Sequence, residues 1–217
     1  MGFINTHISR LTSFYLDYLQ NHDIALFVER SKHYYEQSTI MRLAKSDQVE
    51  TRRAAAMALG FIGDYKSNSV LGCLLVDIDR SVRLLAESSI KNVWPRDGST
   101  YQRHELRLAM RNIAYQNFDE AVRITNNLLD DFPLFAEARN QRGIALYASG
   151  KFKDTIEDCK IVLDLNPYHF GAAIGMGHAY LHDKNKELAI VCFQQALKIN
   201  PNLEAIRRSI TKMVQSF

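Results

Sequence analysis

The sequence predicts an all-α protein, a superhelix (solenoid) built from helical hairpins, and two internal repeats are the main reason. Pro133, Pro167 and Pro201 lie 34 residues apart, and each follows a stretch with apolar residues at helical spacing. Within residues 37–94, a second period of 31 residues relates two shorter pairs of helix-like segments. A fixed period of about 20 to 50 residues is typical of stacked repeat proteins. A helical unit repeated along the chain therefore explains both halves.

Composition supports an ordered globular chain. The 217 residues are 47% hydrophobic and 24% charged, with only four prolines. The 27 basic and 24 acidic residues give a formal net charge of +3, and neither half is strongly basic, so the charge gives little support for a nucleic-acid partner. The longest apolar run is far shorter than the ~20 residues of a membrane-spanning helix. Three widely spaced cysteines without a Cys-x-x-Cys motif indicate a reducing compartment, which we expect to be the cytoplasm.

The 34-residue period covers about residues 101–201. It places Ala109, Gly143 and Gly177 in register, where small residues let two helices approach closely. The third copy reads Ala173, Met176, Gly177, Tyr180, Ala189, Phe193 and Pro201, and the first two copies keep fewer of these residue types. This pattern resembles the tetratricopeptide repeat (TPR). The resemblance implies three repeats, at about residues 102–133, 136–167 and 170–201, followed by an amphipathic capping helix at 203–216 that completes a domain over 101–217.

The 31-residue period aligns Arg52 with Arg83, Ala55 with Ala86 and Leu59 with Ile90. It resembles the short HEAT-like repeat that is also found in phycobilisome lyase subunits, with two copies over residues 37–98. Residues 1–36 are expected to form one or two helices that either cap the array, cover its groove or form a degenerate first repeat. The segment 94–100 is rich in helix breakers, and we expect the boundary between the two arrays there. At the start of the chain, "MGFINT" matches the N-myristoylation pattern at Gly2.

No motif for catalysis or cofactor binding appears in the sequence. A Walker loop, a nucleophile elbow, a zinc-protease motif and a dinucleotide fingerprint are all missing, so we expect no cofactor, no metal and no enzymatic activity. His178 and His182 lie four residues apart on one predicted helix and could bind a metal if a third ligand joined them. We favour two polar residues that line a groove. The phycobilisome resemblance leaves open a second alternative, attachment of a bilin chromophore.

The TPR resemblance implies a groove for a partner protein, because the first helix of each repeat lines the concave face of such arrays. Carried over by register, the groove residues are Arg103, Arg107, Met110, Asn140, Gln141, Ile144, Tyr147, Gly171, Ile174, Gly175, His178 and His182. The groove is then basic at one end, polar and aromatic in the middle, and apolar with imidazoles at the other end. Such a surface suits an extended peptide or a helix, which predicts a protein-binding adaptor or scaffold.

Two further sets of residues bear on the choice of partner. TPR domains that bind chaperone tails clamp an acidic C-terminus with Lys, Arg and Asn at fixed positions. The corresponding positions here hold Leu106, Met110, Gln141, Gly171 and Gly175, so that clamp is not predicted. The alternative partner is nucleic acid, which Arg52, Arg53 and Arg83 of the HEAT-like part could bind. The sequence predicts no oligomeric state.

Overall fold

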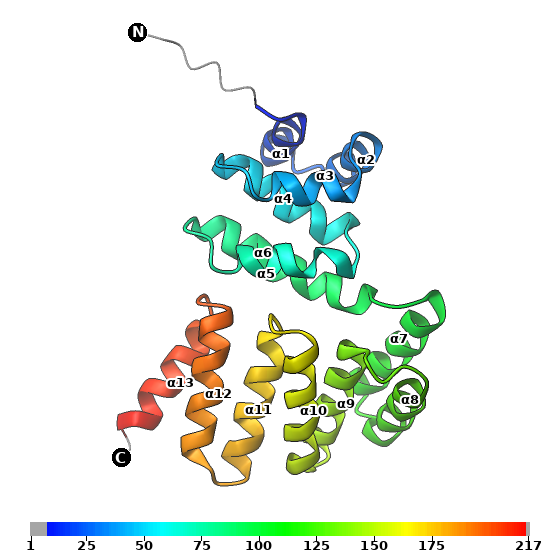
Figure 1. The fold of residues 1–217 in the computed structure, drawn as a ribbon, viewed down its shortest axis with the longest axis vertical. Helices are drawn as coiled ribbons and strands as arrows, with labels where there is room; N and C mark the ends of the chain where they lie inside the picture. Colours follow the sequence, from blue (N-terminus) through cyan, green and yellow to red (C-terminus); the bar gives the residue numbers. More distant parts are fainter. Residues whose placement is uncertain (1–7, 216–217) are drawn as a thin grey trace. The chain divides into compact units, whose positions relative to one another are not determined.

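Residues 8–215 form thirteen α-helices and two short 3-10 helices in a computed structural model, and this described part contains no β-strand (Figure 1). The prediction of an all-α fold of helical hairpins is confirmed. The chain divides into two compact units, Met1–Val93 and Trp94–Phe217. Gly2 of the myristoylation pattern lies outside the described residues. No helix within 8–215 is long and apolar enough to cross a membrane.

The first unit is built around one nearly buried helix. Its elements are α1 (Arg10–Asn21), α2 (Ile24–Tyr34), α3 (Gln37–Leu43), α4 (Val49–Ile62), η1 (Tyr65–Ser67), α5 (Asn68–Leu74) and α6 (Arg80–Val93). The alanines of "RRAAAMALG" give α4 little side-chain bulk, so α1 and α6 both pack closely against it. At Gly60 a Cβ atom would clash with the Ser89 hydroxyl of α6. The pairs α3–α4 and α5–α6 are the two hairpins that the 31-residue period predicts.

The second unit consists of η2 (Trp94–Arg96), α7 (Thr100–Ala114), α8 (Phe118–Asp131), α9 (Ala136–Ala148), α10 (Phe152–Leu165), α11 (Phe170–His182), α12 (Lys186–Ile199) and α13 (Glu204–Gln215). Helices that follow each other along the chain pack together, which gives the hairpins α7–α8, α9–α10 and α11–α12 (Figure 1). The central helix α9 also packs against both α7 and α11. The three first helices therefore form one layer, which we call the inner layer. We call α8, α10 and α12 the outer helices.

Two glycines show why this sequence forms hairpins. Gly177 lies where α11 crosses α12, and a Cβ atom there would lie 2.6 Å from the Phe193 ring. Gly150 turns the chain between α9 and α10 with a φ of 75°, a conformation that costs other residues free energy. The last helix, α13, buries Ile206 against Phe193 and exposes Arg207 and Arg208. It therefore covers the apolar end of the array with a polar outer surface, as a capping helix must.

Candidate functional site

The predicted groove residues on α7 lie at the edge of the inner layer. A capping box between Ser99 and Gln102 starts the helix. Arg107 is exposed, and Arg103 is partly exposed with only long hydrogen bonds of 3.4 Å to the Arg96 carbonyl and the Thr100 hydroxyl. Met110 packs partly against the core beneath α7. This end of the inner layer therefore presents positive charge to solvent.

A buried polar network lies at the start of α9. The side-chain amides of Gln141 and Asn140 donate to one oxygen of the Glu137 carboxylate, at 2.6 and 3.2 Å. His169 Nδ1 accepts a hydrogen bond from the Ala172 backbone N–H at 3.0 Å, so the proton of a neutral ring sits on Nε2 and is donated to the other Glu137 oxygen, 3.1 Å away. Glu137 and His169 are only 5% and 1% exposed. The carboxylate thus has three donors.

This network changes the place of two residues assigned to the groove. Gln141 is 8% exposed and bonds to Glu137, so it supports the inner layer from below and is not part of its open surface. At Gly171, a Cβ atom would lie 3.3 Å from the ring of His169, so the glycine leaves room for that imidazole. The His169 ring also stacks on Trp94, at 4.0 Å between centroids and 16° between planes.

The partners in this network are difficult to predict from the sequence. Trp94 lies in the breaker-rich segment 94–100, and His169 belongs to no motif. Glu137 and His169 are 32 residues apart, and Trp94 is further still from His169. The sequence feature that indicates such a network is Glu137 itself. It is a carboxylate near the start of a first helix, and the other two repeats hold Arg103 and Gly171 at this position.

The residues assigned to the groove on α11 point toward several neighbours. A Cβ atom at Gly175 would lie 3.5 Å from the Cys159 sulfur, so this glycine faces α10. Ile174 packs partly into the cluster of Phe193 and Ile206. Gly175 and Ile174 remain partly exposed, but their contacts leave less open surface on α11 than the register alone implies.

The two histidines of α11 belong to different ring contacts. His178 meets the edge of Phe193 at 5.1 Å, and burial, with a smaller contribution from His182, lowers its pKa. The exposed ring of His182 stacks on Phe152 at 4.5 Å and meets Tyr147 at 5.4 Å. Within residues 8–215, no three His, Cys, Asp or Glu side chains lie close enough to hold a metal ion.

The middle of the inner layer carries the most open side chains. Ile144 on α9 is 43% exposed, although the neighbouring Ala145 and Leu146 are buried. Asn140 and Tyr147 lie on the same side of the helix, one turn before and one turn after Ile144. We use the term inner face for the exposed or partly exposed residues Arg103, Arg107, Met110, Asn140, Ile144, Tyr147, His178 and His182. This face offers charge, an amide, an aliphatic anchor and aromatic rings.

A separate cavity of about 420 Å³ lies among α8, α9 and α10. Its wall includes Arg139 and Arg142, which both bond to the buried carboxylate of Asp158, and Arg142 also bonds to Asn126. The guanidinium groups are thus already engaged by groups of the protein.

Two cysteines of the outer helices, Cys159 and Cys192, are buried. Burial raises the pKa of Cys159 to about 12 and that of Cys192 to about 11. Thiols held protonated in this way are poor nucleophiles.

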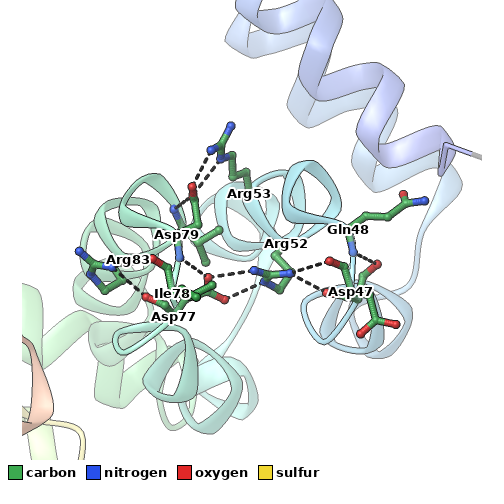
Figure 2. A network of polar contacts seen from close by, with 10 residues as sticks. Asp47, Gln48, Arg52, Arg53, Asp77, Ile78, Asp79 and Arg83 are labelled. Carbon is green, nitrogen blue, oxygen red and sulfur yellow. Dashed lines mark hydrogen bonds and ion pairs between the residues drawn. The ribbon is translucent and has the colours of Figure 1, made fainter. Parts of the chain in front are cut away.

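The arginines of the first unit, the alternative site for nucleic acid, are bound within the fold (Figure 2). Arg52 forms a two-pronged ion pair with Asp77 at 2.7 and 3.0 Å, and its remaining nitrogen donates to the carbonyls of Ser46 and Asp47. Arg83, 31 residues later, donates to the equivalent carbonyls of Asp77 and Ile78. The repeat that the sequence predicts is therefore also a repeat of hydrogen bonds.

Arg53 is held in a second two-pronged pair with Asp79, at 2.9 and 2.6 Å (Figure 2). The Arg53 hydrogen bond is the main reason why the pKa of Asp79 falls to about 2. Burial would raise the pKa of Asp77, but hydrogen bonds from Arg52 and from the Asp79 backbone outweigh it and lower that pKa. A guanidinium group that is already paired with a carboxylate attracts phosphate only weakly. This geometry therefore does not favour the nucleic-acid alternative.

Comparison with known proteins supports a TPR array in the second unit. The profile of the tetratricopeptide repeat family matches residues 172–203. A TPR repeat-containing protein of Rhizobium etli is 30% identical over 92 residues, a region that covers 42% of each protein, so this chain matches less than half of that relative's length.

Solved structures are similar in fold. The first TPR of Spaghetti (RPAP3), bound to the HSP90 peptide SRMEEVD, is 20% identical with a TM-score of 0.52, and the match covers 55% of this chain and 94% of that one. The MamA R50E mutant is 17% identical with a TM-score of 0.44, over 76% and 98% of the two chains. The RPAP3 domain is a peptide-binding protein of the same helical-hairpin fold.

Proposed function

We propose that the second unit is a non-enzymatic adaptor module that binds a linear segment of a partner protein on its inner face. The observation that carries the proposal is Ile144, an exposed aliphatic side chain in the middle of a helix whose neighbouring positions are buried. Asn140 and Tyr147 flank it and supply a hydrogen-bonding amide and an aromatic ring. Anchors of this kind, surrounded by adaptable polar contacts, account for most of the binding energy in protein interfaces.

The likeness to TPR proteins supports this proposal, because the RPAP3 domain holds a peptide on the same kind of fold. The buried network supports it as well. Glu137, Gln141 and His169 tie the start of α9 to the start of α11 beneath the inner face. A surface held rigid before binding loses little conformational entropy when a partner docks.

For the first unit we propose two HEAT-like hairpins, α3–α4 and α5–α6. The 31-residue equivalence of the Arg52 and Arg83 hydrogen bonds supports this assignment. We also propose that the protein works in a reducing compartment such as the cytoplasm, since two of its three cysteines are buried as free thiols in the described structure.

Selection from a random peptide library displayed on phage, with the full chain immobilised, tests the function. The selected peptides are then synthesised and their affinities measured for the wild type, for Ile144→Asp and for the control Val191→Asp. Val191 is also an exposed aliphatic residue, at 57%, but it lies on the outer helix α12.

We expect Ile144→Asp to weaken binding at least about tenfold, because a charge replaces the aliphatic anchor that the bound partner would cover. The control is expected to bind like the wild type. The proposal fails if no peptide is selected, or if the two variants bind equally well.

A further inference from the structure

The helices of the second unit carry their charges in two layers. The inner layer of α7, α9 and α11 contains five arginines and only two carboxylates. The outer helices α8, α10 and α12 contain nine carboxylates and five basic residues. The inner layer is therefore net positive and the outer helices are net negative, and the two charges nearly cancel.

Neither carboxylate of the inner layer reaches the inner face. Glu137 is buried and accepts three hydrogen bonds. Glu105 lies close enough to Arg123 of the outer helix α8 to raise its pKa, after the larger effect of Glu120. The inner face of the described chain therefore carries no exposed carboxylate.

Four of the five arginines of the inner layer fall into two groups, and the guanidinium of the fifth, Arg111, lies over the Tyr115 ring. Arg139 and Arg142 on α9 are neutralised by Asp158. Arg103 and Arg107 on α7 form no ion pair with any carboxylate of residues 8–215, and they lie one helical turn apart on the same side. The uncompensated positive charge of the inner face is thus located on α7.

The part of the inner face beyond α7 has a different chemistry. The rings of Tyr147, Phe152 and His182, from three helices, contact one another there, and Ile144 lies one turn before Tyr147. The face therefore changes from cationic at α7 to aliphatic and aromatic at α9 and α11. Packed helices lie about 8–10 Å apart, so Ile144 and Tyr147 on α9 are separated from the neighbouring helix α7 by the length of roughly three extended residues.

We propose, building on the function above, that the bound segment is bipartite. Two or more aspartates or glutamates face Arg103 and Arg107, and an aliphatic or aromatic residue about three positions away packs between Ile144 and Tyr147. Charge complementarity selects the acidic end and sets the direction in which the segment lies across the inner layer. Free carboxylate side chains are sufficient, so the segment need not be a chain terminus.

Fluorescence anisotropy with synthetic peptides about ten residues long tests the proposal on the full chain. The peptides carry a C-terminal amide, which removes the terminal charge. One has acidic residues at one end and Leu and Phe at the other. The second replaces each acid with its amide, and the third replaces each acid with lysine. Each peptide is made in two orders, with the apolar residues either at the C-terminal end or at the N-terminal end.

The test variant is Arg103→Glu with Arg107→Glu. The matched control is Lys153→Glu with Lys198→Glu, which changes the total charge equally at exposed positions of the outer helices. We expect the acidic peptide to bind at least about tenfold more tightly than its amide form, from two charge-assisted contacts. The test variant should lose this preference and favour the lysine peptide, and the control should retain it.

Arg103→Gln with Arg107→Gln provides a milder variant, and an unchanged thermal midpoint shows that either variant is folded. Equal affinity for the acidic and amide peptides overturns the bipartite segment. The adaptor function survives that result if binding still depends on Ile144. Tighter binding of single-stranded oligo(U) than of the acidic peptide, lost in the test variant, would also overturn the proposal in favour of a nucleic acid.

Discussion

Replacing Glu137 with alanine tests whether the buried network holds the inner layer together. Gln141, Asn140 and His169 donate to this carboxylate at 2.6, 3.2 and 3.1 Å. Water can satisfy the partly exposed Asn140 in the variant, but Gln141 and His169 are buried and lose their acceptor. Each unsatisfied buried donor costs about 1–3 kcal/mol. Removing a buried charge offsets part of this cost, so we expect the second unit to lose about 2–4 kcal/mol of unfolding free energy.

Urea unfolding, followed by the fluorescence of Trp94, measures this loss. Trp94 is the only tryptophan in the chain, and its indole stacks on His169, so its emission reports on the network within the second unit. Glu120→Ala on α8 serves as the control, because it removes a glutamate whose ion pair with Arg123 is exposed; its unfolding midpoint should not change. If Glu137→Ala unfolds at the same urea concentration as the control, the carboxylate is dispensable and our reasoning is wrong.

The isosteric variant Glu137→Gln separates hydrogen-bond direction from volume. Its amide places a donor where the carboxylate accepts from Gln141 or from His169. The imidazole cannot relieve this conflict by moving its proton, because Nδ1 must remain an acceptor for the Ala172 N–H. We therefore expect a smaller loss than in the alanine variant, about 1–2 kcal/mol in the same urea titration.

Three other substitutions follow from the geometry. Gly177→Ala places a methyl group 2.6 Å from the Phe193 ring, so thermal unfolding should show a loss of about 1–3 kcal/mol. Gly150→Ala, at a φ of 75° with open space around it, should cost about 1 kcal/mol through backbone strain alone. The pKa of Asp79 is about 2, below its usual 3.8. Its pair with Arg53 therefore stabilises the first unit above about pH 4, and this is lost as the pH falls toward 2. After allowance for solvent screening, the pair contributes about 1 kcal/mol to the unfolding free energy. When the unfolding free energy is measured as the pH is lowered, Asp79→Asn should not show this loss.

Periodicity was sufficient to predict the fold and the hairpins of the second unit. The 34-residue spacing places each first helix, and α7, α9 and α11 begin within two residues of the positions it indicates. The reason is physical, since a repeat that buries the same side of each helix must place its apolar and small residues at the same positions. Gly177 shows the same logic at a single contact, because its neighbour Phe193 belongs to the same repeat.

The site was harder to predict, because a register position fixes only the direction of a Cβ atom. Whether a side chain is then free depends on the groups around it, which a repeat period does not specify. Gln141 has the register of a groove residue, but its side-chain amide is hydrogen-bonded to Glu137. Gly171 also has that register, and its missing side chain leaves room for the His169 ring. Arg52 and Arg53 appeared as a basic pair in the sequence, and only the fold brings Asp77 and Asp79 to them. The repeat period does not indicate which polar side chains will pair when they lie more than 20 residues apart.

The two polar systems of the second unit support binding in different ways. The Glu137 network is buried, and its hydrogen bonds fix α9 against α11, so the distance between Ile144 and the rings on α11 is set before a partner arrives. The arginines of α7 are left without such partners, so their charge is available to solvent. A carboxylate beside Arg107 would add a surface ion pair of little value to stability, and it would remove the feature that distinguishes one end of the inner face from the other. The distribution of partners thus favours a rigid apolar anchor site next to a charged end that selects what docks there.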